Sequence, residues 1–426
     1  MDCWSSFNSA TTANTFETIF YNYDTNCMAS LYLREDIPSS KKCKYFFSIS
    51  ENAVIKSIFK RTHKTGFLHK SENICVSNEL IQDINETKNR YKKYSKKRNI
   101  FLLLIRELLW KLGKWKSQEL IDFLDSYNPD IVIYGMEGYL HFHTIVRYVL
   151  KHTGAKGYGF FWDENFTFKQ REKKLGFLLH RFLQLNSLKR TVKKTNGFFA
   201  ISPKTAKEAN ETFVINSNFI TKPVQEIEEN SFVKNVVDDK LLFVYTGNLK
   251  IGRFDTLKEI SKILDNNINL SKNIEIDIYS GTYIEDSELK KLNESIVYKG
   301  AISQEEVETV QKDADVLLLL EDIIGENKNV ARLSLSTKTT DYLSKKKCIF
   351  AIGSNDLASI EYLKNNNAAL CASSTKEIEV CLNAVCANPK IIDDFAEKAY
   401  ELGRTNHSRE RIEKIVGEIL GVKFLN

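Results

Sequence analysis

The chain has 426 residues, of which 42% are hydrophobic and 27% are charged. This composition is globular and excludes a disordered chain, and the length exceeds one ordinary core, so we expect two domains. Residues 1–224 hold 35 lysines and arginines against 21 aspartates and glutamates, whereas residues 225–426 hold 26 against 34. The basic first half therefore favours an anionic surface or substrate.

Cysteine spacing and the absence of long apolar segments bear on the compartment. The eight cysteines form no Cys-x-x-Cys pair, and several lie inside apolar runs, which is typical of buried free thiols in a reducing compartment. The first residues lack the apolar core of a signal peptide. The longest apolar run, residues 100–110, is interrupted by Arg106 and Glu107 and is too short to cross a bilayer. We expect a cytoplasmic protein, soluble or peripheral at the inner face of the membrane.

The first half of the chain alternates predicted strands and helices. Apolar and β-branched runs predict strands at 28–34, 44–50, 130–136, 156–162 and 197–202. Helical periodicity is found at 51–60, 97–112, 117–126, 141–153, 170–194 and 203–213. This order is typical of an α/β domain. Because no apolar strand precedes the loop at 5–14, we expect a very short first strand or a start upstream of Met1.

The second half shows the same alternation more clearly. Strands are predicted at 241–247, 274–281, 296–301, 315–321, 348–353 and 368–373. Amphipathic segments such as 254–267 and 303–314 separate them, which predicts a parallel, Rossmann-like sheet covered on both faces. Residues 391–420 are predicted to be helical with a break near 403–407. We expect domains at 1–222 and 223–404, and a terminal helix at 405–426 that packs back on the first domain through Ile412, Ile415, Val416 and Ile419.

A glycine-containing loop follows the strand at 241–247, with the sequence Tyr-Thr-Gly-Asn-Leu-Lys-Ile-Gly-Arg. In open parallel sheets ligands bind beyond the carboxyl ends of the strands. Gly247 and Gly252 allow a tight turn, and Arg253 offers forked donors suited to phosphate oxygens. The Lys-Ser/Thr of a Walker loop is absent. The alternative is a plain turn with a surface arginine.

A second candidate segment is residues 332–343, before the strand at 348–353. Ser336 is predicted to cap a helix, which places Lys338 in the first turn, where the helix dipole already favours an anion. Asp341 shares a helix face with Lys338. A lysine for a diphosphate beside a carboxylate for ribose hydroxyls suits a nucleotide sugar. The alternative is a capped helix with a solvated Lys338–Asp341 salt bridge.

Acidic residues follow two predicted strands of the first half. Glu137 comes after 130–136, and Asp163 and Glu164 come after 156–162. A carboxylate there can deprotonate or orient an acceptor hydroxyl. The alternatives are that Glu137 caps the next helix and that the other two are loop charges. His141 and His143, two residues apart, do not share a helix face, so no metal site is expected.

Four segments of the second half, taken in order, carry a family resemblance. YTGNLKIGR, VYKGAIS, KDADVLLLL and STKTTDYLSKKKCIFAIG resemble the C-terminal domain of bacterial GT-B glycosyltransferases, over residues 240–375. The similar family is the large retaining one (group 1, or family 4) that builds cell-surface polysaccharides. The resemblance implies two Rossmann-like domains facing across a cleft, and sugar transfer without a cofactor from a UDP- or GDP-linked donor to a glycan or lipid-linked glycan.

The resemblance also implies roles for individual residues. Carried over by position, the implied donor-binding residues are Gly247, Asn248, Arg253, Ala301, Ile302, Ser336, Lys338 and Asp341. Gly247, Arg253 and Lys338 would bind the diphosphate, Ala301 and Ile302 the base, and Asp341 the ribose. Lys338, Arg253 and Asp163 are the catalytic candidates; Glu137, Asp163 and Glu164 are the acceptor-side candidates. The chain departs from the family at Asp341, where glutamate is common, and at Leu333, where many members carry a glutamate near the donor sugar.

Two basic stretches, Lys88–Arg98 and residues 169–194, suggest a further partner. No nucleic-acid-binding motif accompanies them, so we expect no nucleic acid. An anionic membrane surface fits better, and a solvated basic loop is the alternative. Two other functions stay open on this sequence: a sugar-nucleotide epimerase of GT-B-like fold, and a non-catalytic GT-B partner subunit.

Overall fold

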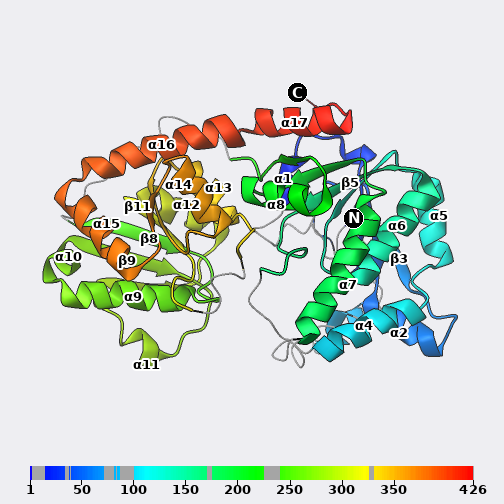
Figure 1. Cartoon of the computed structure of the whole chain (residues 1–426), viewed down its shortest axis with the longest axis horizontal. Helices are drawn as coiled ribbons and strands as arrows, with labels where there is room; N and C mark the ends of the chain where they lie inside the picture. The colour runs from blue at the N-terminus through cyan, green and yellow to red at the C-terminus, as the bar shows by residue number, and fades with distance from the viewer. Residues whose placement is uncertain are drawn as a thin grey trace.

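The computed structural model describes residues 1, 15–33, 38, 40–71, 81–82, 84–86, 100–169, 175–224, 240–325 and 331–425. The chain forms two α/β halves, and a long C-terminal helical segment runs from the second half back to the first (Figure 1).

The second half is built on a six-stranded parallel sheet with the order β10-β9-β8-β11-β12-β13. The strands are β8 (Leu241–Thr246), β9 (Ile274–Tyr279), β10 (Ile296–Gly300), β11 (Val316–Leu320), β12 (Cys348–Ile352) and β13 (Leu370–Ala372). All six predicted strands are therefore confirmed. The carboxyl ends of the strands lie along one edge of this sheet.

Helices cover both faces of this sheet. They are α9 (Arg253–Asn266), α10 (Ile268–Asn273), α11 (Asp286–Leu289), α12 (Gln304–Asp313), α13 (Thr337–Leu343), α14 (Ala358–Asn365) and α15 (Thr375–Ala387). Successive strand residues point to opposite faces. Phe243 accordingly packs in a core with Leu257 of α9, whereas Val244 packs in another with Tyr342 of α13. Burial on both sides explains the near-continuous apolar strands.

The first half has two sheets. β1 (Ala29–Tyr32), β2 (Tyr45–Ile49) and β3 (Gly66–Lys70) form one, and β4 (Ile131–Gly135), β5 (Lys156–Phe161), β6 (Gly197–Ala200) and β7 (Ser217–Phe219) form the other. All described pairs are parallel except β2 with β3. The amino group of Met1 donates to the Ile133 carbonyl, 2.5 Å away, so the chain begins beside β4. The expected first strand falls in residues outside the described set.

The helices of the first half follow the predicted segments, except that the short α1 and η1 were not predicted. They are α1 (Thr15–Ile19), η1 (Thr25–Cys27), α2 (Glu51–Phe59), α4 (Ile100–Leu112), α5 (Gln118–Tyr127), α6 (Leu140–Thr153), α7 (Leu175–Val192) and α8 (Pro203–Phe213). Strong caps fix several of them: the Ser50, Ser117 and Ser202 hydroxyls each accept a backbone N–H of the following helix.

The C-terminal segment forms α16 (Lys390–His407) and α17 (Arg409–Leu420). The break lies at Ser408, one residue beyond the predicted range, because its hydroxyl caps α17. α16 packs on β12, whereas α17 crosses to α1 of the first half (Figure 1). Ile412, Val416 and Leu420 are buried in one core with Phe16 and Phe20, so the predicted docking is confirmed. No helix among the described residues has the length and apolarity needed to span a membrane.

The six described cysteines are free thiols. Cys43 and Cys348 are buried as predicted, and burial raises the pKa of the Cys348 thiol to about 12. Cys27 is exposed, against the expectation of burial, because it lies in the short surface turn η1. Cys3 and Cys75 lie outside the described residues.

Candidate functional site

The loop after β8 makes two close approaches that only glycine permits. Gly247 has φ +138°, and a Cβ there would lie 2.3 Å from Lys338 Cε. Gly252, the N-cap of α9, has φ +79°, and a Cβ there would lie 2.3 Å from Asp322 Cγ. Any side chain would therefore be strained in conformation and would clash. Gly247 thus allows the loop to pass directly against Lys338.

Arg253, at the start of α9, is fixed by a bidentate ion pair with Glu321. Its Nη2 lies 3.0 Å from both Glu321 oxygens, and its Nε donates to the Leu320 carbonyl at 3.1 Å. Nη1 donates to Asn248 Oδ1 at 2.9 Å. Burial alone would lower the pKa of Arg253, but the Glu321 charge outweighs it and raises the pKa. The guanidinium is a permanent, preorganised cation at the carboxyl edge.

Lys338 reaches the same edge from α13. Its half-buried ammonium donates to the Tyr245 hydroxyl at 3.2 Å and lies 4.7 Å from the centroid of that ring. Burial and the neighbouring Arg253 lower the pKa of Lys338 to about 8, although Glu321 and Asp341 act in the opposite direction. Ser336 is at the N-cap by position, but the structure gives it no side-chain capping bond; its backbone N–H donates to Ser359 Oγ at 2.9 Å.

Asp341 pairs with Lys222 and not with Lys338. Lys222 follows β7 of the first half, and its ammonium nitrogen lies 2.7 Å from Asp341 Oδ1. The alternative of a plain Lys338–Asp341 salt bridge is therefore wrong. Ala301 and Ile302 follow β10 at the same carboxyl edge, two strands from β8, where Gly300 has φ +82°. The structure thus brings the predicted donor-binding residues to one edge of one sheet.

A small open pocket of about 80 Å³ lies beside Arg253. It is lined by Arg253, Glu321, Ala331, Ser334, Ser336, Leu357 and Ser359. A fixed cation, a buried carboxylate and three hydroxyls suit a ligand that carries both negative charge and hydroxyl groups. Asp163 of the first half reaches the rim, because Ser334 Oγ donates to its Oδ1 at 2.8 Å.

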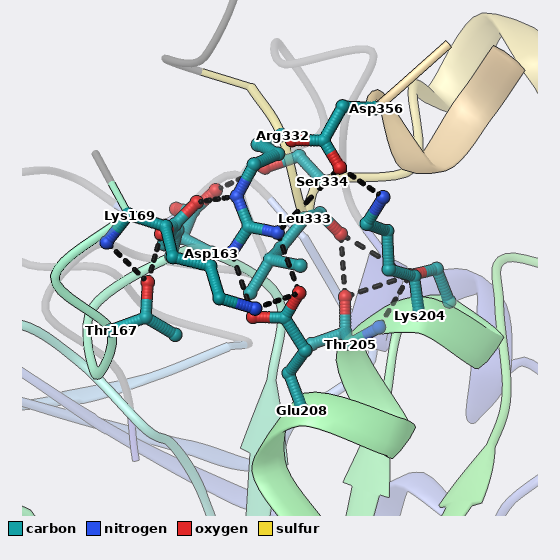
Figure 2. A network of polar contacts seen from close by, with 12 residues as sticks. Asp163, Thr167, Lys169, Lys204, Thr205, Glu208, Arg332, Leu333, Ser334 and Asp356 are labelled. Atoms are coloured by element: carbon teal, nitrogen blue, oxygen red, sulfur yellow. Dashed lines mark hydrogen bonds and ion pairs between the residues drawn. The ribbon is translucent and has the colours of Figure 1, made fainter. Parts of the chain in front are cut away.

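The segment beside the pocket is bound into the first half through Arg332 (Figure 2). Arg332 is buried, and its Nη1 and Nη2 lie 2.5 and 2.7 Å from the oxygens of Glu208, while its Nε donates to Glu164 at 2.9 Å. Burial by itself would lower the pKa of Arg332, but the carboxylates of Glu208 and Glu164 outweigh it and raise the pKa. Glu164 also accepts from the Thr167 hydroxyl. Glu164 is therefore a structural partner, whereas Asp163 accepts a hydrogen bond from Ser334, which lines the pocket.

Leu333 and Lys204 complete this contact between the halves. The Leu333 carbonyl accepts from Thr205 Oγ1 at 2.5 Å and from Ser202 Oγ at 3.2 Å, and its side chain is buried in a core of the first half. Lys204 binds Asp356 and Glu361 at 2.6 and 2.7 Å. The position where the family often has a donor-sugar glutamate is thus used for packing.

The remaining acceptor-side candidates lie near β4. Glu137 is buried after β4, and Tyr139, not Glu137, is the N-cap of α6, so the capping alternative is wrong. His143 Nε2 lies 2.7 Å from the Glu137 carbonyl, and burial lowers the pKa of His143 to about 4. His141 pairs with Glu107 at 2.9 Å. Across the described ranges, no group of three or more His, Cys, Asp or Glu side chains is arranged to hold a metal ion.

Sequence reasoning missed several partners in the site. The site residues expected from the sequence did not include five that the structure places in or beside the site: Glu321, Tyr245, Lys222, Arg332 and Ser359. Glu321 did carry a signal, because a carboxylate directly after a buried apolar strand sits at the carboxyl edge where ligands bind. The others act through contacts between distant segments, which strand patterns do not reveal.

No protein-family model matches the sequence, and no curated protein matches it. Solved structures are similar in fold. HepE from Anabaena in complex with UDP has a TM-score of 0.54 at 9% identity, over 73% of this chain and 83% of that one. Sucrose-phosphate synthase from Thermosynechococcus elongatus has 0.53 at 11%, over 74% and 78%. TarM has 0.51 at 12%, over 74% of this chain but only 58% of its own length.

These similar structures are GT-B glycosyltransferases, and the chain has the GT-B fold that the resemblance implied. At such identities the similarity establishes the fold, while substrates have to be argued from the site itself.

Proposed function

We propose that this protein is a glycosyltransferase that moves a sugar from a UDP- or GDP-linked donor to an acceptor hydroxyl. The observation that carries the proposal is the pocket beside Arg253, where a fixed cation and a carboxylate lie at the carboxyl edge of the second sheet, with Asp163 of the first half at the rim. HepE, similar in fold, was solved with UDP and with UDP-glucose, which supports a nucleotide-sugar donor.

In this proposal Arg253 and Lys338 bind the diphosphate. Negative charge grows on the leaving nucleotide during transfer, so preorganised cations stabilise the transition state more than the ground state. Gly247 lets the loop backbone approach the diphosphate, and Asn248 holds Arg253 in place through a hydrogen bond. Ser336 lines the pocket.

In this proposal, residues near the neighbouring strands bind the nucleoside part of the donor. We assign the ribose hydroxyls to Asp341, held by Lys222, and the base to the backbone of Ala301 and Ile302. On the acceptor side Asp163 is the catalytic candidate, because its carboxylate is hydrogen-bonded to the pocket-lining Ser334 and can accept a proton from a hydroxyl.

The proposed acceptor is a glycan or lipid-linked glycan of a cell-surface polysaccharide, used at the cytoplasmic face of the membrane. TarM was solved with UDP and glycan-like ligands, namely fondaparinux and alpha-GlcNAc-glycerol. An anionic membrane surface is the proposed partner of the basic first half. The Lys88–Arg98 stretch lies outside the described residues, so this partner rests on sequence charge.

The test is nucleotide binding followed by product analysis. In a thermal-shift series with UDP, GDP and ADP, the nucleotide that carries the same base as the true donor should raise the melting temperature most. Incubation with the matching nucleotide sugars should then release nucleoside diphosphate, faster when a glycan acceptor is added. An epimerised nucleotide sugar formed without acceptor would instead identify an epimerase. Stabilisation by none of the nucleotides would point to a non-catalytic subunit.

A further inference from the structure

The segment that joins β9 to α11, residues 280–285, carries a highly exposed aromatic side chain (Figure 1). Tyr283 is 87% exposed. Its neighbour Ile284 packs against the core that holds Leu257 of α9. Ile284 therefore anchors the chain on the sheet, and the Tyr283 ring stands outward just beyond the carboxyl end of β9.

On one side this segment is fixed to the loop after β8, which carries the proposed diphosphate contacts. The Gly247 N–H donates to the Tyr279 carbonyl at 2.9 Å, and the Leu249 N–H donates to Thr282 Oγ1 at 3.0 Å. Tyr283 therefore directly follows a residue that is hydrogen-bonded to the diphosphate loop.

On its other side the segment is fixed to β10, whose carboxyl end leads to the proposed base-binding backbone. The Ser280 N–H donates to the Gly300 carbonyl at 2.8 Å. The Tyr298 hydroxyl lies 2.6 Å from both the Ser280 and the Thr282 carbonyls. These contacts hold the backbone immediately before Tyr283 against both neighbouring strands.

Tyr283 is therefore carried by a fixed backbone next to the proposed base site. A Cβ at Gly281 would lie 3.7 Å from Ala301 Cβ, which is van der Waals contact distance. Because the backbone is already ordered, less conformational entropy is lost when a ligand packs on the ring. The flat face of an aromatic side chain suits a planar nucleobase, and such stacking tolerates any base.

We propose that the Tyr283 ring stacks on the nucleobase of the donor nucleotide. This deepens the proposed function, on which it rests, because it adds a side chain for the face of the base to the backbone of Ala301 and Ile302. A sugar ring also packs on aromatic faces. The position between the diphosphate loop and Ala301 favours the base, which lies beyond the diphosphate and the ribose in a nucleotide.

The experiment is calorimetric titration of the full chain with UDP, GDP and ADP and with inorganic pyrophosphate. Tyr283→Ala should weaken binding of the preferred nucleoside diphosphate by about tenfold or more, the effect of removing one stacked aromatic side chain. Its affinity for pyrophosphate should be unchanged, because the proposed phosphate contacts are Arg253 and Lys338. Tyr283→Phe keeps the ring and should bind like wild type.

The matched control is Ile268→Ala, which should bind every ligand like wild type. Ile268 is an exposed apolar residue at the start of α10, which precedes the amino end of β9 and so lies away from the carboxyl edge. Tyr283→Trp adds a spectroscopic readout: the nucleoside diphosphate should change its emission relative to wild type, and pyrophosphate should not. Ile268→Trp should show no nucleotide-dependent change.

Three outcomes would overturn the inference: wild-type nucleotide affinity in Tyr283→Ala, an equal loss in Tyr283→Phe, or an equal loss of pyrophosphate affinity in Tyr283→Ala. The melting temperature of Tyr283→Ala should match wild type, because the ring is exposed. If wild type binds none of the three nucleotides, the proposed function itself fails. If wild type and Tyr283→Ala bind equally well, the donor site stands and only the stacking role is lost.

Discussion

The two candidate diphosphate cations are held in different ways. Arg253 is fixed by Glu321 through a bidentate pair and stays charged at any physiological pH. Lys338 has no carboxylate partner in the described ion pairs; it lies over Tyr245 with a pKa of about 8. Arg253 is thus already neutralised by Glu321, whereas the charge of Lys338 is compensated fully only when an anion binds.

Replacing Lys338 by alanine should therefore strongly reduce donor use while leaving the fold intact. We expect turnover to fall by about 10²–10³, as when one preorganised donor to a developing anion is removed. The loss of nucleotide-induced thermal shift should accompany a near-normal melting temperature. Lys338→Arg should recover only part of the turnover and of the nucleotide-induced thermal shift, because a planar guanidinium does not fit the close approach to Gly247. Lys346→Ala, on the exterior, is the control. Wild-type binding and turnover in Lys338→Ala would place the donor site elsewhere.

The low pKa of Lys338 predicts a pH dependence of binding. Below about pH 8 the ammonium is charged and attracts the diphosphate; above it the free protein holds a neutral amine. Nucleoside diphosphate affinity should therefore decline as pH rises through 8, with proton uptake on binding between pH 8 and 9. Calorimetry in buffers of different ionisation enthalpy measures that uptake. The same decline in Lys338→Arg would assign it to another group.

Glu321 is predicted to bind the donor sugar as well as hold Arg253. It lines the pocket, and Leu333, at the position of the family glutamate, is buried elsewhere. Glu321→Gln should lower donor-sugar affinity by about tenfold or more, the size of a lost hydrogen bond to a charged group. Affinity for the free nucleoside diphosphate should be kept, because Arg253 remains charged. Titrations with UDP and UDP-sugar compare the two. Equal losses for both would mean that Glu321 only positions Arg253.

At the scale of elements, residues 332–334 belong to the second half by sequence but contact both halves. Arg332 ends in a buried triad with Glu164 and Glu208, and Leu333 fills a core of the first half. This short loop therefore lines the pocket through Ser334 and joins the two halves through Arg332 and Leu333; Figure 2 shows the contacts that join the halves.

Removing Arg332 should be strongly destabilising. Arg332→Ala leaves the buried Glu164 without its arginine and Glu208 with only the exposed Lys169, and we expect a loss of about 3–5 kcal/mol in the free energy of unfolding. Arg332→Met with Glu164→Gln and Glu208→Gln should restore most of it, since no buried charge is left unpaired. Lys204→Ala, whose partners are more exposed, should cost about 1 kcal/mol or less. Urea unfolding measures all three. A loss below 1 kcal/mol in Arg332→Ala would contradict the role of the triad.

The elements that sequence predicted are those whose own residues carry the pattern. The second sheet was predicted because its central strands, such as β11 and β12, are buried on both faces. β3 and β7 were missed, since β3 buries only two residues and β7 only one, and both depend on pairing with β2 and β6. For α7 the pattern predicted a helix but not its face, because its polar contacts come from α6 and the loop at Gly138.

The residues of the site were likewise predicted only where the local sequence carries the pattern. Gly247, Arg253 and Lys338 were expected together because parallel strands end at one edge. The Arg253–Glu321 and Lys222–Asp341 pairs join residues 68 and 119 positions apart, and no local spacing signals them.

Across the whole molecule, one buried imidazole joins three parts of the chain. His407, the last residue of α16, has Nδ1 2.6 Å from Thr221 Oγ1 and Nε2 2.7 Å from the Tyr362 hydroxyl. Its carbonyl accepts from the Val224 N–H at 2.8 Å. The segment after β7, α14 and the bend before α17 therefore meet at this side chain. Burial, with Arg411 acting in the same direction, lowers the pKa of His407 to about 4.

This junction predicts how stability depends on pH. The unfolded chain takes up a proton on this histidine below about pH 6.5, whereas the folded protein resists until about pH 4. The free energy of unfolding should therefore fall as pH falls from 6.5 toward 4, by roughly 1.4 kcal/mol per pH unit for each such group. His143, with a pKa also lowered to about 4, adds a second contribution of the same sign.

The variant His407→Gln should reduce that slope by up to roughly 1.4 kcal/mol per pH unit between pH 6.5 and 5, a window above the range in which carboxylates titrate, while the other histidines with lowered pKa values keep their share. It should also lower stability at pH 8 by about 1–3 kcal/mol, because the buried Thr221 hydroxyl loses its imidazole partner and the Tyr362 hydroxyl keeps only Asn406. Tyr362→Phe is the control: it removes one of these hydrogen bonds but keeps the buried imidazole, so the pH slope should persist. Urea unfolding at half-unit pH steps gives the slopes. A wild-type slope in His407→Gln would show that acid sensitivity arises away from the junction between the halves.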